Sequence, residues 1–375
     1  MKKIKVCCFC EKWLSGGIES FLNNVFHNLD ISLFQVDIIA SEIGDSIFTE
    51  TLQKLGVNFY ELSGNQKKLM SNYRLLKKLL KNNDYDVIYI NAYHAVSMTY
   101  AKLAHSLNIP QIIVHSHCSA IKKSCTRFFK VWAHKLSSRI FSKYATDFLA
   151  CSGLAAEFMF PKKVIANGRY VFIPNGIETD KFTFNEEHRN NVRQELNLQD
   201  TFVIGCVGRL CVEKNQLFLL DVFAQAVNIR DCRLVLVGKG EQEEVLRKKA
   251  EALGISNKVI FYGTSNEVNR LICGFDCLAM PSLFEGLMIV AIEAQSIGLP
   301  IVCSDRVPKE VFVGEGIKAV ALEKSTKEWA EAIFSCEKTG TYSDSNKSDL
   351  IKAGFDIKNT AAMIQNVFLK GFIDE

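Results

Sequence analysis

Residues 4–22 read Ile-Lys-Val-Cys-Cys-Phe-Cys-Glu-Lys-Trp-Leu-Ser-Gly-Gly-Ile-Glu-Ser-Phe-Leu, and this stretch contains the unit from which the whole chain is built. The apolar run at residues 4–10 predicts a buried strand. The paired glycines Gly16 and Gly17 predict a tight turn, and a helix with apolar residues at helical spacing follows. A strand, a turn and a helix in this order are the repeating unit of a parallel sheet.

The same alternation continues nearly throughout, which predicts an α/β fold with doubly wound parallel sheets. A chain of 375 residues exceeds the roughly 250–300 residues of a single core, so we expect two such domains. Ile173-Pro174-Asn175-Gly176-Ile177 predicts the boundary, because proline favours an extended neighbour and Asn-Gly favours a turn. The expected domains are residues 1–174 and 175–357. The predicted strands are residues 4–10, 35–40, 57–62, 86–91, 111–115, 147–151 and 171–174, then 202–207, 233–237, 258–262, 277–280 and 301–304.

Composition excludes several classes of protein. With 48% hydrophobic and 23% charged residues, the chain is neither disordered nor collagen-like nor a coiled coil. The 13 cysteines are scattered through apolar runs, which indicates reduced thiols in a cytoplasmic protein. No stretch approaches the ~20 apolar residues of a membrane span. Positive charge is concentrated early, with 22 Lys and Arg against 14 Asp and Glu in residues 1–180, and 23 against 27 afterwards.

Ligands of open α/β sheets bind beyond the carboxyl ends of the strands, so we expect the chemistry in the loops that follow strands. In the first such loop, Gly16 and Gly17 would let the backbone approach an anion at the start of the next helix. An ordinary flexible turn is the alternative. After residues 202–207, Gly208-Arg209 and Glu213-Lys214-Asn215 supply two cations that suit a diphosphate, unless this is a solvated surface loop.

The loop after residues 277–280 carries Glu285-Gly286-Leu287-Met288, and Glu293 follows in an apolar helix. With a helix beginning near Gly286, Glu293 would lie about 10 Å along its axis. Two carboxylates so spaced suit the two ends of a nucleotide sugar, with the N–H groups of Leu287 and Met288 at the phosphates between them. The alternative is that Glu293 is paired with a lysine.

Histidines follow the predicted strand at residues 111–115. His117 is the first choice for a residue that binds a sugar hydroxyl or carries protons, and His115 is the second. His94 is a weaker candidate on the acceptor side.

A basic segment, residues 121–145, contains seven Lys and Arg and no acidic residue, interleaved with aromatic and aliphatic side chains. Such a helix could bind an anionic membrane surface, and we take Lys122, Lys123, Arg127, Lys130 and Trp132 as candidates for that contact. Nucleic acid is a competing polyanion, but no nucleic-acid-binding module accompanies the segment. A helix that packs its apolar face on the sheet is the third interpretation.

With these motifs in hand, the chain resembles the retaining glycosyltransferases of family 4, in particular the EpsF-like branch of exopolysaccharide and capsule enzymes. The resemblance implies the GT-B fold, in which two Rossmann-like domains face each other across a cleft. It also implies an acceptor-binding first domain, a donor-binding second domain and a last helix, about 358–375, that packs back on the first. The implied contacts are Gly17 with the donor phosphate or sugar, Arg209 and Lys214 with the diphosphate, Glu285 with the sugar, Glu293 with the ribose and His117 as the active-site histidine. The remaining donor-side residues are Gly16, Asn175, Gly208, Gly286, Leu287 and Met288.

The expected activity is transfer of a hexose or N-acetylhexosamine from a nucleotide sugar, UDP-linked by preference, to a glycan or lipid-linked oligosaccharide. We expect retention of configuration, no metal, no other cofactor and no nucleic-acid partner, in the cytoplasm or on the inner face of the membrane. A non-catalytic nucleotide-sugar-binding subunit is one alternative. A second is an NAD(P)-dependent oxidoreductase, for which Gly238-Lys239-Gly240 supplies only part of the glycine fingerprint. Asp84-Tyr85-Asp86 has the spelling of a metal-binding motif but precedes a strand, so it is predicted to be a polar turn.

Overall fold

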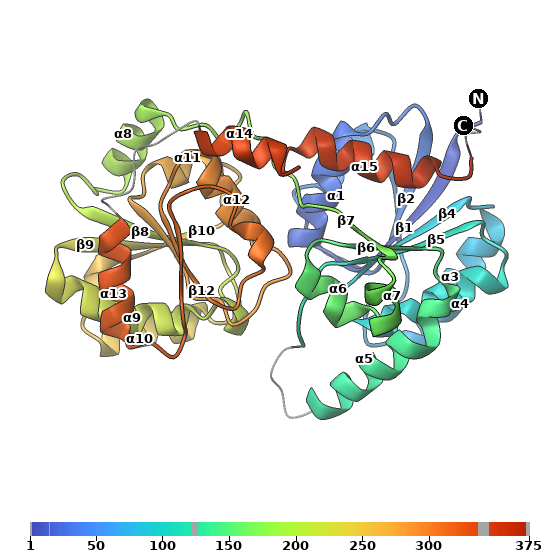
Figure 1. Cartoon of the computed structure of the whole chain (residues 1–375), viewed down its shortest axis with the longest axis horizontal. Helices are drawn as coiled ribbons and strands as arrows, with labels where there is room; N and C mark the ends of the chain where they lie inside the picture. The colour runs from blue at the N-terminus through green and yellow to red at the C-terminus, as the bar shows by residue number, and fades with distance from the viewer. Residues whose placement is uncertain (1, 15, 122–126, 337–344, 373–375) are drawn as a thin grey trace. The chain divides into compact units, whose positions relative to one another are not determined.

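The computed structural model describes residues 2–14, 16–121, 127–336 and 345–372, drawn in Figure 1. The chain divides into two compact units. Unit 1 consists of Met1–Gly176 together with Ile357–Glu375, and unit 2 is Ile177–Asp356. The division thus falls two residues beyond the predicted boundary, and the last helix belongs to unit 1.

Unit 1 is built on a seven-stranded parallel sheet with the order β3-β2-β1-β4-β5-β6-β7. All seven strands were predicted, with ends that differ by a few residues. The largest differences are in β1 and β2, which both continue three residues past their apolar runs, where Lys12 pairs with Glu42 at 3.3 Å. The strands are β1 (Ile4–Trp13), β2 (Phe34–Ile43), β3 (Asn58–Glu61), β4 (Val87–Ala92), β5 (Gln111–Ser116), β6 (Asp147–Ala150) and β7 (Tyr170–Phe172).

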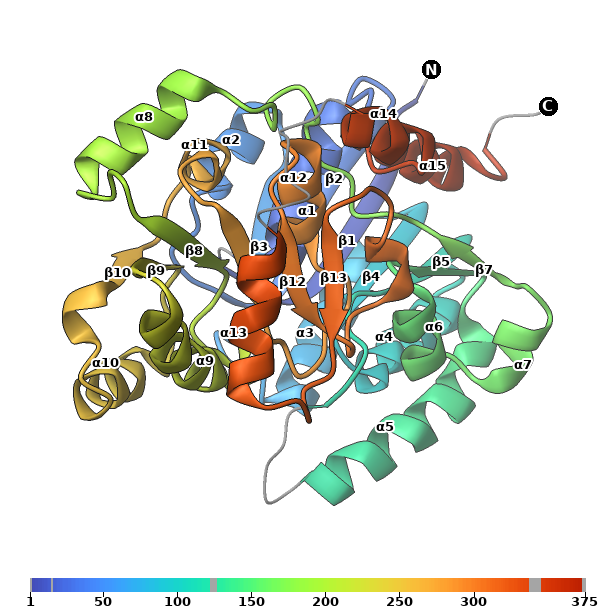
Figure 2. The same ribbon diagram turned by 60° about the vertical axis from the view of Figure 1, so that its left-hand side comes forward.

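Helices cover both faces of this sheet (Figures 1 and 2). On one face α1 packs beside α15, whose Phe368 ring lies 5.7 Å from Phe34 and 5.3 Å from Tyr89. On the other face the Tyr100 ring of α4 lies 4.6 Å from Phe9. The helices are α1 (Gly17–Asn28), α2 (Thr49–Lys54), α3 (Leu69–Asn82), η1 (Ala95–Met98), α4 (Thr99–Ser106), α5 (Arg127–Phe141), η2 (Ser142–Tyr144), α6 (Gly153–Met159), α7 (Lys162–Ala166) and α15 (Ile357–Leu369).

Unit 2 contains a six-stranded parallel sheet with the order β10-β9-β8-β11-β12-β13. Five of these strands were predicted and β13 was missed. It is a four-residue edge strand with no fully buried residue, so it lacks the apolar run that identified the others. The strands are β8 (Phe202–Val207), β9 (Cys232–Val237), β10 (Val259–Gly263), β11 (Cys277–Met280), β12 (Ile301–Ser304) and β13 (Ile317–Val320).

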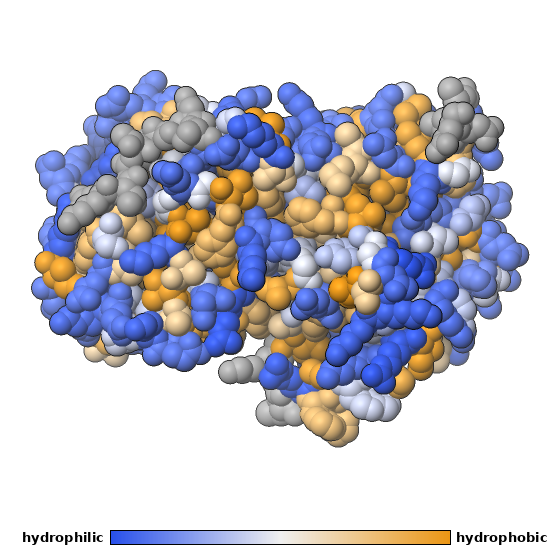
Figure 3. Space-filling view, viewed as in Figure 1, coloured by the Kyte–Doolittle hydropathy of each residue, from blue (hydrophilic) through white to orange (hydrophobic). Residues whose placement is uncertain are grey.

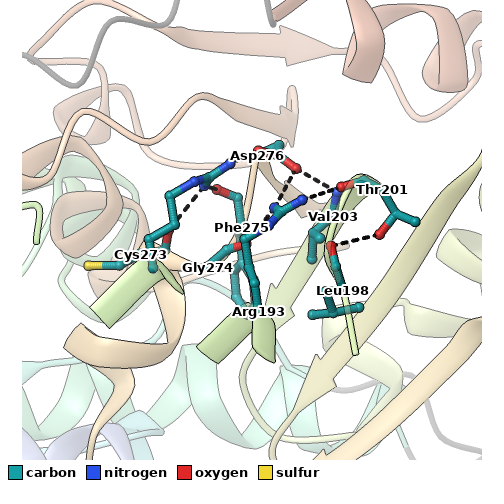
Figure 4. A network of polar contacts seen from close by, with 9 residues as sticks. Arg193, Leu198, Thr201, Val203, Cys273, Gly274, Phe275 and Asp276 are labelled. Carbon is teal, nitrogen blue, oxygen red and sulfur yellow. Dashed lines mark hydrogen bonds and ion pairs between the residues drawn. The ribbon is translucent and has the colours of Figure 1, made fainter. Parts of the chain in front are cut away.

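One polar network anchors the first helix of unit 2 to its sheet (Figure 4). The side chains of Arg189 and Arg193 in α8 both bind Asp276, at 2.5 and 3.1 Å. Asp276 also accepts from the Val203 N–H at 2.7 Å, and Arg193 donates to the Thr201 carbonyl. The helices of this unit are α8 (Glu186–Glu195), η3 (Val212–Lys214), α9 (Gln216–Ile229), α10 (Glu243–Ala252), η4 (Ser256–Lys258), α11 (Val268–Cys273), α12 (Ile289–Ser296), η5 (Lys309–Val311), α13 (Thr326–Ser335) and α14 (Ser345–Lys352).

Within the described part of the chain, none of the helices combines the length and the hydropathy that a membrane crossing requires.

Candidate active site

An ion pair joins the loop after β8 to the loop after β11 in unit 2. The Lys214 Nζ lies 2.7 Å from the Glu285 Oε1, and both side chains are mostly buried. The same Oε1 accepts from the Ser282 hydroxyl at 2.6 Å. Ser282 is held in turn, because its carbonyl accepts from the Ser304 hydroxyl at the end of β12. The structure therefore brings together two of the predicted residues and fixes the carboxylate of one from two sides.

The backbones of these two loops are also joined. Asn215 has a left-handed conformation, with φ of +57°, which asparagine tolerates better than most residues. Its amide donates to the Pro281 carbonyl at 3.1 Å. The Leu283 N–H donates to the Glu213 carbonyl at 2.8 Å. This turn thus separates the short helix η3 from α9 and sets Lys214 against the second loop.

Three glycines permit a close approach of backbone or side chain at the same edge of the sheet. A Cβ on Gly208 would lie 3.2 Å from the Cε of Lys214, so the lysine side chain passes over this residue. A Cβ on Gly238 would lie 2.1 Å from the Gly208 carbonyl oxygen, and one on Gly240 would lie 2.2 Å from the Leu210 oxygen. The glycines after β9 are therefore required by the packing of two loops, so they do not support the dinucleotide-binding interpretation.

Arg209 follows Gly208 and differs from Lys214 in exposure. Its side chain is 59% exposed, and its guanidinium lies 3.9 Å from Glu213, a long ion pair. Its carbonyl accepts from the Gln216 amide at 3.0 Å, which fixes the backbone while the side chain stays in solvent. Arg209 therefore presents much of its guanidinium to solvent, unlike the mostly buried Lys214.

Glu293 lies in α12, but that helix begins at Ile289 rather than near Gly286 as predicted. The loop crosses the sheet edge for three more residues, burying the Leu287 and Met288 side chains, so Glu293 is about 6 Å into the helix. Among the described residues it makes no ion pair, and Lys181 is the cation whose charge acts on it. Burial raises the pKa of its carboxyl from 4.5 to about 7, although the charge of Lys181 acts in the opposite direction. Glu293 is half-buried and protonates near neutral pH.

The same loop leaves backbone donors unused. The N–H groups of Leu287 and Met288 have no acceptor within the part of the chain that the structure describes. As whole residues, Leu287 and Met288 are 8% and 1% exposed, so neither side chain is available at the surface. Gly286 precedes them without a side chain of its own. Adjacent free N–H groups before a helix form an anion-binding geometry.

In unit 1 the two predicted glycines serve different purposes. A Cβ on Gly16 would lie 2.7 Å from the Glu19 carboxylate, which accepts from the Leu14 N–H at 3.1 Å. A side chain at position 16 would therefore displace the Glu19 carboxylate. No atom lies within 4 Å of a Cβ on Gly17, which is exposed at the first position of α1. Only Gly17 leaves its space open for a ligand.

The two histidines lie on either side of the strand end. His115 is fully buried in β5, where its Nδ1 lies 2.6 Å from the Tyr89 hydroxyl. His117 follows the strand and is half-buried, and its Nε2 donates to the Asn91 side-chain oxygen at 2.9 Å. Their rings are 4.0 Å apart, and both contact Phe21 of α1. Both histidines therefore lie beside α1, and His117 is the more exposed of the two.

Both imidazoles are neutral at ordinary pH. Burial lowers the pKa of His117 to about 3, and burial together with the His117 ring keeps the pKa of His115 well below its usual value. A ring with so low a pKa is a poor proton carrier near pH 7. His117 can instead orient a ligand hydroxyl by hydrogen bonding.

Two further predicted residues of unit 1 lie apart from these. His94 precedes η1, and its buried Nδ1 has no hydrogen-bond partner among the described residues. Asn175 is 6% exposed in the last segment before unit 2 and belongs to unit 1, although it was predicted on the donor side. Its side-chain oxygen is likewise buried without a partner there.

Within the basic segment, Arg127–Phe141 form α5, and the structure contradicts one interpretation of this segment. The buried residues of this helix are polar, namely His134, Ser137 and Ser138. Arg127, Lys130 and Trp132 are exposed, while Lys122 and Lys123 lie outside the described residues. The alternative that α5 packs its apolar face on the sheet is therefore wrong, because hydrogen bonds to the backbone occupy the inward face.

Candidate metal and thiol groups were also located. Within the described ranges no three His, Cys, Asp or Glu side chains cluster closely enough to hold a metal ion. Asp86 accepts from the Lys5 N–H at 2.8 Å just before β4, which is the predicted polar turn. Cys7 and Cys10 are fully buried, and burial raises the pKa of both thiols.

Sequence reasoning missed the residues that position the site. Ser282, Ser304 and Asn91 contact Glu285, Ser282 and His117 respectively. The only signal available for Ser282 and Asn91 was a polar residue at the end of an apolar run. The left-handed conformation of Asn215 before α9 was likewise not predicted.

Comparison with known proteins assigns the family. The family models "Glycosyltransferase Family 4" and "Glycosyl transferases group 1" match residues 15–181 and 188–354. EpsF of Bacillus subtilis (strain 168) is 28% identical over 94% of this chain and 93% of its own length. The UDP-Gal:alpha-D-GlcNAc-diphosphoundecaprenol alpha-1,3-galactosyltransferase of Escherichia coli is 25% identical over 81% of this chain and 80% of its own.

Solved structures agree on the fold. HepE of Anabaena, solved with UDP and glucose, superposes with a TM-score of 0.80 at 19% identity, covering 98% of this chain and all of the other. Sucrose-phosphate synthase from Thermosynechococcus elongatus gives a TM-score of 0.75 at 17% identity, with 99% of each chain covered. With a family 4 domain followed by a group 1 domain on two parallel-sheet units, the chain belongs to the glycosyltransferases of the GT-B type.

Proposed function

We propose that this protein transfers a hexose or N-acetylhexosamine from a UDP-sugar to a glycan or lipid-linked oligosaccharide in bacterial surface polysaccharide biosynthesis. The observation that carries the proposal is the 2.7 Å contact between Lys214 and Glu285. It joins a cation suited to a diphosphate and a carboxylate suited to sugar hydroxyls.

Other groups of unit 2 complete a site for a nucleotide sugar. Arg209 is exposed and can turn toward the diphosphate, and the N–H groups of Leu287 and Met288 lack acceptors among the described residues. Glu293 offers its carboxyl to the ribose hydroxyls, which explains why a half-buried acid is kept in an apolar helix. The choice of UDP is supported by HepE, solved with UDP, and by the E. coli relative, named for UDP-Gal.

We infer that transfer retains the anomeric configuration by attack from the leaving-group face. The bond between the anomeric carbon and the diphosphate oxygen breaks, and the acceptor oxygen bonds to the same face of that carbon. The acceptor proton passes to the departing diphosphate, whose charge Lys214 and Arg209 stabilise. Lys214 can do so without leaving Glu285, because an ammonium group has three donors. His117 orients a hydroxyl through neutral imidazole.

The test compares Lys214→Ala with Lys249→Ala. Lys249 is a matched control because it also forms a half-buried ion pair, at 2.5 Å with Asp221, but lies on the helix α10. We expect Lys214→Ala to lower kcat for transfer from a UDP-sugar by about 10²–10³. We expect Lys249→Ala to leave it near the wild-type value. Equal rates in two folded variants would contradict the assignment.

Gly17→Ala tests the glycine loop of unit 1. Alanine fits there without a collision and is a better helix residue than glycine, so the variant should fold at least as stably. A ligand that approaches Gly17 closely would meet the new methyl group, so we expect weaker donor binding or slower transfer. Unchanged kinetics would remove Gly17 from the site.

Three further assays address the alternatives. Release of free UDP from a UDP-sugar without acceptor separates an enzyme from a nucleotide-sugar-binding subunit. Transfer that continues in the presence of a chelator supports metal-independent chemistry, and its loss would contradict it. Thermal shifts with UDP-, GDP- and dTDP-sugars at equal concentration rank the donors, since the stabilisation of the native state by a ligand rises with the logarithm of its affinity.

A further inference from the structure

The positive charge of unit 1 is gathered in one part of its sequence. Residues 62–146 contain 14 Lys and Arg but only two acidic residues, Asp84 and Asp86. Both lie in the turn before β4, where Asp86 binds the Lys5 N–H. The helices α3, α4 and α5, which follow one another in this segment, therefore carry no acidic side chain.

These three helices lie on the same face of the sheet, opposite α1 and α15 (Figures 1 and 2). The Tyr73 ring of α3 stacks on Tyr100 of α4 at 6.4 Å, and Tyr100 packs on Phe9 of β1. The α5 side is attached through His134, whose Nδ1 accepts from the Ala95 N–H of η1 at 3.0 Å. The result is a continuous layer with basic side chains on its outer surface.

Large apolar side chains also point outward from this layer. Phe128, Phe129 and Trp132 of α5 are 78%, 70% and 61% exposed. In α5 the stripe continues at intervals of four residues, while the inward face is polar. Figure 3 shows hydrophobic and hydrophilic side chains interleaved along the lower edge, over α5. The other exposed members are Leu136 and Ile140 in α5 and Leu69, Met70 and Leu75 in α3.

We propose that the outer surface of α3 and α5 docks on an anionic lipid bilayer. Aromatic and aliphatic side chains enter the interfacial region, and the flanking lysines and arginines remain at the headgroups. Charge complementarity favours the anionic bilayer as the partner. A second copy of this chain docked through the same surface would place one acid-free face against another. Nucleic acid would use the cations but would leave the aliphatic residues in water. The inference extends the proposed function, because a lipid-linked acceptor resides at such a surface.

The experiment is flotation of the full chain with phosphatidylcholine vesicles, with and without phosphatidylglycerol. We expect flotation only with the anionic vesicles, weaker at high salt. Phe128→Ser with Phe129→Ser and Trp132→Ser should lower the bound fraction about tenfold or more. The matched control, Ile229→Ser with Val245→Ser, removes residues of unit 2 that are about half exposed and should bind like wild type.

Tryptophan fluorescence gives a second, local readout. Of the three tryptophans, Trp13 and Trp329 are fully buried and only Trp132 is exposed. Anionic vesicles should therefore shift the wild-type emission to shorter wavelength, and Trp132→Phe should abolish the shift.

Four results would overturn the proposal. The first two are the absence of flotation of folded protein at low salt and the absence of an emission shift. The third is oligonucleotide binding without vesicle binding, if the apolar substitutions leave the oligonucleotide binding intact. The fourth is self-association without vesicle binding, if the same substitutions abolish the self-association. The outcome is separable from the proposed function. Vesicle binding without transfer would refute the activity alone, and transfer to a soluble acceptor without vesicle binding would refute the docking surface alone.

Discussion

The carboxyl of Glu293 gives unit 2 a stability that depends on pH in an unusual direction. Burial raises its pKa from 4.5 to about 7, so the folded state binds this proton more tightly than the unfolded state does. Below about pH 4.5 both states are protonated and the group costs nothing. Stability is then lost as the pH rises through the folded pKa, and above it the loss is complete.

The size of this loss follows from the two pKa values. The difference between 4.5 and about 7 corresponds to about 3 kcal/mol at 1.36 kcal/mol per pH unit. Glu293→Gln removes the titration while keeping the size of the side chain. Relative to wild type, we therefore expect the variant to gain about 3 kcal/mol between about pH 4.5 and pH 8.

The assay must report on unit 2 alone, since a two-unit chain need not unfold in one step. Urea unfolding followed by hydrogen exchange and mass spectrometry of peptides from β8 and β11 does so. A free-energy difference between Glu293→Gln and wild type that is the same at about pH 5 and pH 8 would refute the reasoning. UDP binding adds a functional check. The affinity for UDP should rise with pH more steeply in wild type than in Glu293→Gln, and the variant serves as the control for the titration of UDP itself.

Other perturbations have equally definite outcomes. Burial keeps His117 neutral, so wild type should lose stability as the pH falls below 6.5, and His117→Gln should recover about 2 kcal/mol at about pH 5 in the same unfolding assay. Asn215→Ala should be less stable than Asn215→Gly by about 1 kcal/mol, because only glycine accepts a φ of +57° without strain; equal urea midpoints would contradict this. Asp276→Ala leaves two arginines without their carboxylate and should cost about 2–4 kcal/mol, whereas Glu244→Ala, which breaks an exposed pair, should change the midpoint little.

The sequence predicted most strands because parallel strands are buried on both faces and so appear as apolar runs. It failed where that signal was absent, as at the edge strand β13. The predicted start of α12 was also three residues early. Gly286 is a typical turn residue before a helix, and nothing in the local sequence shows that Leu287 and Met288 are buried before the helix begins.

The candidate site was predictable to a similar extent. The charged residues Lys214 and Glu285 stood out by type and spacing, but their contact depends on two loops that are 71 residues apart. Ser282 had no distinguishing feature until it was seen to bind Glu285. The inward face of α5 was unpredictable for the same reason, since His134 and Ser138 are buried only because distant backbone groups bind them.

Several residues are of a type that ordinarily destabilises a fold at their position, and they differ in whether the protein itself compensates for the cost. The glycines Gly238 and Gly240 are explained within the protein, because neighbouring carbonyls fill the space that a side chain would need. Glu293 and the apolar stripe of α5 have no such explanation within the described residues. Glu293 is a half-buried acid with no ion pair there, and the stripe places Trp132 and two phenylalanines in water. Each lowers the stability of the isolated chain, and each would be relieved by contact with a ligand, a nucleotide in one case and a bilayer in the other. Because features that cost stability can be retained where function requires them, these two features agree with the surfaces at which we propose that donor and membrane bind.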